Sequence, residues 1–115
     1  MPGDGRRAGR ASARSLRPRE IAAVRSGRPL RTKRLIMYLA PADGSPGIAV
    51  IAGRRVGGAV VRNRARRILR EAWRAVAPGL EQEYRAVLVA TPEIRGAKTG
   101  EVAGEIAEAL GGALG

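Results

Sequence analysis

A run of guanidinium groups between residues 54 and 74 is the most chemically distinctive feature of this sequence. The run, RRVGGAVVRNRARRILREAWR, holds eight of the 22 basic residues and a single acid, Glu71. A guanidinium forks onto phosphate oxygens and stacks on nucleobases, so this run indicates a binding surface for RNA or another polyanion. The 115 residues include neither His nor Cys, which excludes zinc sites built on those ligands and Ser-His or Cys-His catalysis. We therefore expect neither a zinc site nor a catalytic His or Cys in the protein.

The spacing of the apolar residues predicts that this run forms one amphipathic helix, which begins at Ala59 and ends before Pro78. Steps of three and four residues place the apolar side chains on one stripe, with Trp73 at its border. The stripe consists of Val61, Ala65, Ile68, Leu69, Ala72 and Val76. The opposite side is basic and consists of Arg62, Asn63, Arg64, Arg66, Arg67, Arg70 and Arg74. One side is thus expected to be buried, and the other to be almost entirely guanidinium.

Four interpretations of the basic side compete. A solvated surface is the ordinary one, but like charges four residues apart repel, and one such row consists of Arg62, Arg66, Arg70 and Arg74. Natural helices normally intersperse acids, whereas this helix has only Glu71. A DNA recognition helix normally comes with a helix-turn-helix or dimer context, and the sequence shows neither. A membrane-surface helix needs large exposed apolar residues, whereas this apolar stripe is required for the core. Structured RNA, which proteins recognise largely by shape and phosphate, is favoured.

The distribution of charge supports a polyanion partner. The net charge is +12, and the basic excess lies in residues 1–34, with eleven basic and two acidic residues, and in residues 54–74. Residues 75–115 are mildly acidic, with three basic and six acidic residues. The excess of Arg over Lys also fits a GC-rich genome, but that bias does not explain the clustering.

The first 17 residues are expected to form a disordered basic tail, because they consist mainly of Gly, Ala, Ser and Arg and offer little to bury. A mitochondrial transit peptide is a weaker alternative, because such a peptide is an amphipathic helix and Pro and Gly interrupt this one. No secretory apolar segment precedes the domain, and no apolar run reaches the ~18 residues of a membrane span.

Residues 18–115 are predicted to form one small α+β domain. Pro18 opens a short helix that ends at Gly27, and residues 100–114 show helical spacing, with Glu101, Glu105 and Glu108 expected on the outside. Strands are expected at residues 34–40, 48–52 and 85–91, and another can start between residues 28 and 33. The first two of these three strands are expected to pair as a hairpin. The order gives a mixed sheet of three or four strands with three helices, and a parallel pair around the basic helix.

Residues 57–71, GGAVVRNRARRILRE, resemble the RNR signature of the bacterial ribonuclease P protein subunit. The resemblance extends from about Leu16 to Leu110, and the predicted helices and strands follow the family's order. Arg54 and Arg55 fall where the family has a basic pair after a strand. An Arg-Asn-Arg run alone would be a weak match, but the preceding glycines, the Arg-Arg and Arg-Glu continuation and the position between two strands make it specific.

The resemblance implies a protein that binds the large catalytic RNA and helps it to remove the 5′ leader of precursor tRNA in the cytoplasm. Mg²⁺ would be held mainly by the RNA, so the resemblance implies no catalytic and no metal-ligating residue in the protein. It also implies no further protein partner and no membrane. The implied contacts to the catalytic RNA are Arg54, Arg55, Arg62, Asn63, Arg64, Arg66, Arg67 and Arg70. A left-handed crossover between the parallel strands is implied, in place of the usual right-handed one. A non-catalytic protein that binds structured RNA or the ribosome is the alternative.

The resemblance also implies a leader-binding cleft between the first helix and the sheet, formed by Ile21, Val24 and Tyr38. Tyr38 shares a strand face with Ile36 and Ala40, and a leader base stacked on it would be worth ~1–3 kcal/mol. The alternative for Tyr38 is a core residue at the edge of the sheet. The family commonly has two Phe on this helix, whereas the sequence contains no Phe. Stacking is therefore expected to rest on Tyr38 alone and to be weaker.

Overall fold

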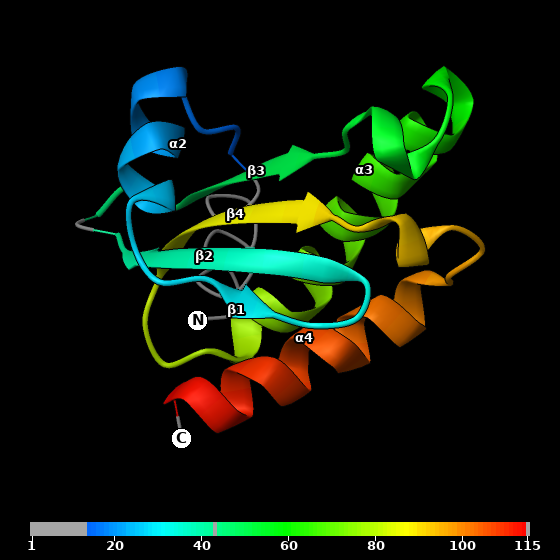
Figure 1. The fold of residues 1–115 in the computed structure, drawn as a ribbon. Coiled ribbons are helices and arrows are strands. Elements are labelled where there is room, and N and C mark those ends of the chain that lie inside the picture. The colour runs from blue at the N-terminus through cyan, green and yellow to red at the C-terminus, as the bar shows by residue number, and fades with distance from the viewer. Residues whose placement is uncertain (1–13, 43, 115) are drawn as a thin grey trace.

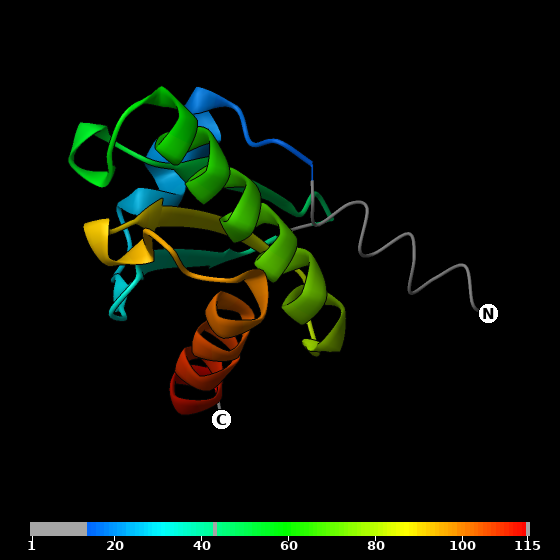
Figure 2. The ribbon, with the colours of Figure 1, turned by 90° about the vertical axis from the view of Figure 1, so that its right-hand side faces the viewer.

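The computed structural model describes residues 14–42 and 44–114, which form a four-stranded sheet with helices on both faces (Figures 1 and 2). The helices are α2 (Pro18–Arg25), α3 (Ala59–Val76) and α4 (Thr99–Leu114), and the strands are β1 (Leu30–Arg31), β2 (Leu35–Pro41), β3 (Gly47–Ile51) and β4 (Tyr84–Ala90). Short 3-10 turns lie at η1 (Arg54–Val56), η2 (Ala77–Gly79) and η3 (Pro92–Ile94). The predicted α+β class and the predicted order of elements are confirmed. None of these helices combines the length and apolarity needed to cross a membrane.

The strand order is β1-β2-β4-β3, so the predicted hairpin between β2 and β3 is wrong. β4 lies between them, antiparallel to β2 (Leu35 opposite Ala90) and parallel to β3 (Ile51 opposite Val89). The physical reason lies in β4 itself, where Ala86, Val87 and Leu88 are all buried. A strand that is apolar on both faces belongs at the centre of a sheet, where neighbours and helices cover it on all sides.

The connection from β3 through α3 to β4 is left-handed. In Figure 1 both strands point to the right with β3 above β4, and α3 crosses behind the sheet, as the turned view of Figure 2 shows. Nearly all strand–helix–strand connections have the opposite hand, so this crossover is an uncommon feature of the fold. It carries α3 across the face of the sheet that lies opposite α2.

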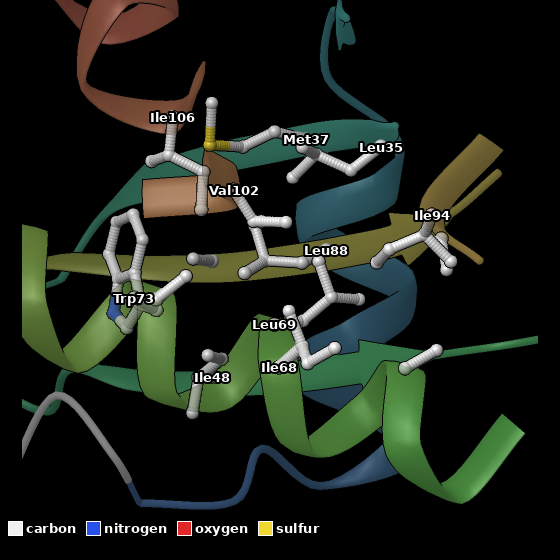
Figure 3. Close-up of a cluster of buried hydrophobic side chains, with 14 of the residues drawn as sticks. Leu35, Met37, Ile48, Ile68, Leu69, Trp73, Leu88, Ile94, Val102 and Ile106 are labelled. Atoms are coloured by element: carbon white, nitrogen blue, oxygen red, sulfur yellow. The ribbon is translucent and has the colours of Figure 1, made fainter. Parts of the chain in front are cut away.

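The main core lies between the sheet and the pair α3 and α4. Leu69 and Trp73 of α3, Ile106 of α4 and Leu88 of β4 belong to one buried cluster, in which Leu69 lies beside Leu88 (Figure 3). Trp73, which the spacing places at the border of the apolar stripe, is 1% exposed, so the buried side of α3 extends to include it. Its large ring fills the space between α3 and α4, which an aliphatic core without Phe leaves open. Full burial of each such side chain stabilises the fold by about 1.5–3 kcal/mol.

A smaller apolar layer covers the other face of the sheet, and the segment before α2 is part of it. Leu16 is buried with Val24, Ala49 and Val87. The backbone of its segment is bonded to β3: the Leu16 N–H donates to the Ile48 carbonyl at 3.0 Å, and the Ile48 N–H donates to the Arg14 carbonyl at 2.7 Å. A Cβ on Gly47 would lie 2.6 Å from the Leu16 side chain, so only Gly allows this close approach. The predicted disordered tail is therefore wrong for residues 14–17, and residues 1–13 lie outside the described part.

Glu20 fastens this segment to the sheet. Its carboxylate accepts hydrogen bonds from the Arg14 side chain (3.1 Å) and from the Arg17 backbone N–H (2.8 Å), and it pairs with Arg85 of β4 (3.4 Å). The Arg14 hydrogen bond is the largest cause, followed by that of the Arg17 backbone N–H and by the charges of Arg14 and Arg85. Together they lower the pKa of Glu20 to about 2.

Glu105 of α4 was expected on the outside, and the structure corrects this. The side chain is half-buried and accepts hydrogen bonds from the Thr32 hydroxyl, the Arg34 backbone N–H (2.8 Å) and the Arg34 guanidinium (3.1 Å). Burial opposes ionisation, but these hydrogen bonds outweigh it, so the pKa of Glu105 is lowered. The contact holds the turn between β1 and β2 against α4.

Candidate nucleic-acid interface

Two glycines set the direction in which the basic helix α3 begins. Gly57 has a φ of +151°, and a Cβ at that position would lie 2.9 Å from the Val61 side chain. Only Gly accepts both the backbone conformation and the contact. Gly58 then provides an extended N-cap. Arg54 and Arg55 lie in the preceding turn η1 and are exposed, so they stand beside the start of the helix.

The structure places the predicted RNA-contacting residues of α3 on its solvent side. Ala65, Ile68, Leu69 and Ala72 are buried on the opposite side. The exposed members of the basic side are Asn63, Arg64, Arg67 and Arg74, and the half-buried members are Arg62, Arg66 and Arg70. The amphipathic helix predicted from spacing is thus confirmed in its start, its end and its two sides.

Very little of the positive charge on α3 is neutralised. Among the described residues, five of its six arginines form no ion pair, and the sixth, Arg67, stands 3.9 Å from Glu71 in an exposed contact. Exposed pairs of this kind contribute about 0–1 kcal/mol. The Arg66 guanidinium donates a hydrogen bond to the Asn63 side chain. The Nε of Arg62 is buried and has no hydrogen-bond partner in the described part of the chain. Such a surface carries strong positive potential and free donors.

Glu71, the single acid of the run, is directed toward α4 and Arg67. Its carboxylate accepts a hydrogen bond from the Thr99 hydroxyl at the start of α4, at 3.3 Å. It therefore helps to hold the two helices together, and it leaves the row of Arg62, Arg66 and Arg70 without an acid.

The three residues predicted to form a cleft lie together on the face of the sheet that α2 covers. Val24 is 3% exposed and is a member of the apolar layer, whereas Ile21 and Tyr38 are half-buried at its margin. Ile21 and Tyr38 thus present surface to solvent, while Val24 presents almost none. Its contribution is to hold α2 on the sheet.

Arg25, the last residue of α2, lies over the ring of Tyr38, and sequence reasoning missed it. Its Cζ is 5.5 Å from the ring centroid, which is within the range of a cation–π contact. Arg25 is exposed, and within residues 14–42 and 44–114 it has no ion-pair partner. No local pattern in the sequence pairs the end of one helix with the middle of a strand thirteen residues later.

A strip of half-buried aliphatic side chains continues this surface toward η1. Ile36, Val89 and Ile51 stand opposite one another in register across β2, β4 and β3, on the same face as Tyr38. Arg31 of β1 is opposite Ile36 and extends the row to the edge of the sheet. These strip residues were not predicted as site residues, because register between distant strands cannot be read from sequence.

The two candidate surfaces lie on opposite faces of the sheet and approach each other at one end. α2 lies on one face and α3 on the other (Figures 1 and 2). Ile51 ends β3, and Arg54 and Arg55 follow it before α3 begins. The exposed arginines of η1 therefore lie between the aliphatic strip and the guanidinium row.

Comparison with known proteins gives one consistent result. The sequence model of the family described as "Ribonuclease P" matches residues 10–113. The ribonuclease P protein component of Acidothermus cellulolyticus is 37% identical over 93 residues, which are 78% of this chain and 78% of that protein. The corresponding protein of Chloroflexus aurantiacus is 42% identical over 88 residues, which are 74% of this chain and 65% of that protein.

Solved structures show the same fold. A ribonuclease P protein mutant of Staphylococcus aureus, described as defective in mRNA degradation, superposes with a TM-score of 0.73 at 15% identity and covers 88% of this chain and 87% of its own. The ribonuclease P protein of Thermotoga maritima superposes with a TM-score of 0.69 at 16% identity and covers 82% of this chain and 92% of its own. At these identities the likeness concerns the fold alone.

Proposed function

The chain belongs to the ribonuclease P protein family, and from this premise we propose that it is the protein subunit of a bacterial ribonuclease P. In that role it binds the catalytic RNA and assists the removal of the 5′ leader from precursor tRNA, in the cytoplasm where tRNA matures. The protein thus works within an endoribonuclease complex. The proposal assigns it binding and positioning, and it assigns the cleavage chemistry to the RNA subunit.

The observation that carries this proposal is the guanidinium row of α3, formed by Arg62, Arg66 and Arg70. No carboxylate of the described residues pairs with this row, and Glu71 beside it pairs with Arg67. Structured RNA offers phosphates at a spacing that such a row can contact, and each contact releases counterions. We propose that Arg62, Arg66 and Arg70 contact phosphates, with Asn63, Arg64 and Arg67 beside them, and Arg54 and Arg55 at the start of the helix.

The opposite face is proposed to hold the single-stranded leader. Ile21 and Tyr38 are half-buried there, next to the aliphatic strip and close to the exposed arginines of η1. An apolar floor bordered by guanidinium groups suits a strand whose bases are unpaired and whose phosphates face outward. Val24 supports this surface from beneath, because it is buried.

Mg²⁺ is assigned to the RNA subunit. Phosphate and water oxygens are the hard ligands that this ion prefers, and an RNA supplies them in number. The described residues of the protein contain no group of three or more acidic, His or Cys side chains that could hold a metal ion. The protein's part is electrostatic and geometric: its guanidinium groups hold phosphates in place and its apolar face orients the leader.

A comparison of precursor and mature tRNA tests the leader assignment. The complex of protein and cognate catalytic RNA is expected to bind precursor tRNA more tightly than mature tRNA, and Tyr38→Ala should weaken only the precursor, by about 5- to 100-fold for one lost stack. Tyr38→Phe is the matched control, because it keeps the ring. Equal losses for both tRNAs would place Tyr38 in the core and contradict the assignment.

A further inference from the structure

The contact between Arg25 and Tyr38 determines which planar group on this surface a base of an RNA strand can stack on. The guanidinium of Arg25 lies over the tyrosine ring, with its Cζ 5.5 Å from the centroid. While Arg25 stays there, that face of the ring is covered, so a base cannot stack on it directly. Arg25 itself is exposed, so the outer side of its planar group is open to solvent.

A guanidinium plane supported by an aromatic ring is a stacking surface in its own right. Unpaired RNA bases stack on Arg planes as they do on aromatic side chains. The ring beneath attracts the guanidinium and restricts its position, so less side-chain freedom is lost when a base arrives. The chain contains no Phe, and Ile21 and Val24 are the apolar residues of α2 on this face. Arg25 is therefore the planar group that α2 brings to this surface.

The neighbouring strip supplies a floor without hydrogen-bond donors or acceptors in its side chains. Ile36, Val89 and Ile51 are half-buried and aligned across three strands, one row from Tyr38. Aliphatic side chains can cover the flat side of a base, but they cannot distinguish its polar edge. A base held here would be recognised by its plane and by its position, and hardly by its identity.

We propose that Arg25, supported by Tyr38, is the platform on which one base of a single-stranded RNA stacks, with the strip of Ile36, Val89 and Ile51 as the floor for the adjoining nucleotide. The subsite rests on the proposed function, in which this face holds the 5′ leader. Tyr38 then acts as a positioning residue for Arg25, and the base contacts the guanidinium.

A thermodynamic cycle between the protein and the leader tests this subsite. The complex of protein and cognate catalytic RNA is titrated with precursor tRNAs that carry an abasic nucleotide at one leader position at a time, with wild-type protein and with Arg25→Ala. The variant is expected to weaken the fully based precursor by about 5- to 100-fold. At one leader position, the abasic precursor should bind equally to the complexes with wild-type protein and with Arg25→Ala. The reason is that two changes that break the same contact are not additive.

Two substitutions separate stacking from charge and from general effects on α2. Arg25→Lys keeps the charge but lacks the plane, so it should lose most of the affinity that Arg25→Ala loses. Arg19→Ala removes an exposed arginine from another side of the same helix. With this variant, the abasic nucleotide should weaken binding of the precursor as much as it does with the wild-type protein. Full rescue by Lys would mean that Arg25 acts only as a charge, which would overturn the inference.

The sign of the Arg25→Ala effect is the sharpest outcome. A loss that one abasic position cancels supports the subsite. Tighter binding would mean that Arg25 covers Tyr38 and competes with the base, and unchanged binding would mean that no base stacks there; either result overturns the inference. A failure of the proposed function looks different, because the wild-type complex would then bind precursor and mature tRNA equally.

Discussion

Replacing Arg62, Arg66 and Arg70 of α3 by Ala should weaken binding of the catalytic RNA and flatten its dependence on salt. Each phosphate contact that is lost reduces the slope of log affinity against log salt concentration by about 0.7–0.9. Three contacts therefore account for a slope change of about 2–2.7. Raising the salt concentration fourfold, from about 50 to 200 mM, should weaken RNA binding by both proteins. The loss of affinity should be about 20- to 40-fold larger for the wild-type protein than for the variant.

The assay is a filter or fluorescence titration of the RNA with protein at several salt concentrations. The same positions replaced by Lys are the matched control, because the charge and its counterion release are retained. The substitutions are expected to weaken RNA binding without weakening the helix. Ala is the best helix former, and removing the row relieves repulsion of about 0.2–0.5 kcal/mol per pair. The helix content should therefore not fall. An unchanged slope in the Ala variant would refute the view that this row contacts phosphate.

Three further predictions concern the scaffold that holds the two surfaces. Gly57→Ala should destabilise the protein by about 1–3 kcal/mol, because φ is +151° there and a Cβ has no space, and it should also weaken RNA binding, since α3 would begin in another direction; normal RNA affinity would contradict this. Leu69→Ala, at a fully buried site, should lower the free energy of unfolding by about 2–5 kcal/mol, measured by the fluorescence of the single Trp73. The pKa of Glu20 is lowered to about 2, so its contribution to the free energy of unfolding is complete above pH 4.5 and is lost as the pH falls toward 2. The free energies of unfolding of wild type and Glu20→Gln should therefore converge over that range. A constant difference would show that the Arg14 contact does not depend on charge.

The helices could be predicted from sequence because their signals are local. The spacing of Val61, Ala65 and Leu69 and the stop at Pro78 gave α3 its limits and its buried side. The same reasoning failed for Trp73, because a residue at the border of a stripe is buried or exposed according to the neighbouring helix. Local periodicity states which side of a helix is apolar, and it does not state how much of that side a partner covers.

The strand pairing and the surface on the α2 face of the sheet depend on contacts between residues that are distant in sequence. They could therefore not be predicted from local patterns. β4 separates β2 from β3, and only its burial on both faces hints at a central place. Leu16 lies in a polar stretch without strand periodicity, yet its N–H donates a hydrogen bond to the Ile48 carbonyl of β3. Glu105 was expected on the outside, yet it contacts Arg34 of the turn before β2. No pattern in the sequence paired Arg25 with Tyr38.

Reconstitution with a cognate bacterial ribonuclease P RNA tests the central claim most directly. Cleavage of the leader from precursor tRNA is measured at low Mg²⁺ concentration with the RNA alone, with the RNA and the protein, and with the RNA and the variant that lacks Arg62, Arg66 and Arg70. We expect the wild-type protein to stimulate cleavage strongly and the variant to do so much less at physiological salt. If the protein binds the RNA but does not stimulate leader cleavage, it is an RNA-binding protein without this role, which contradicts the proposed function.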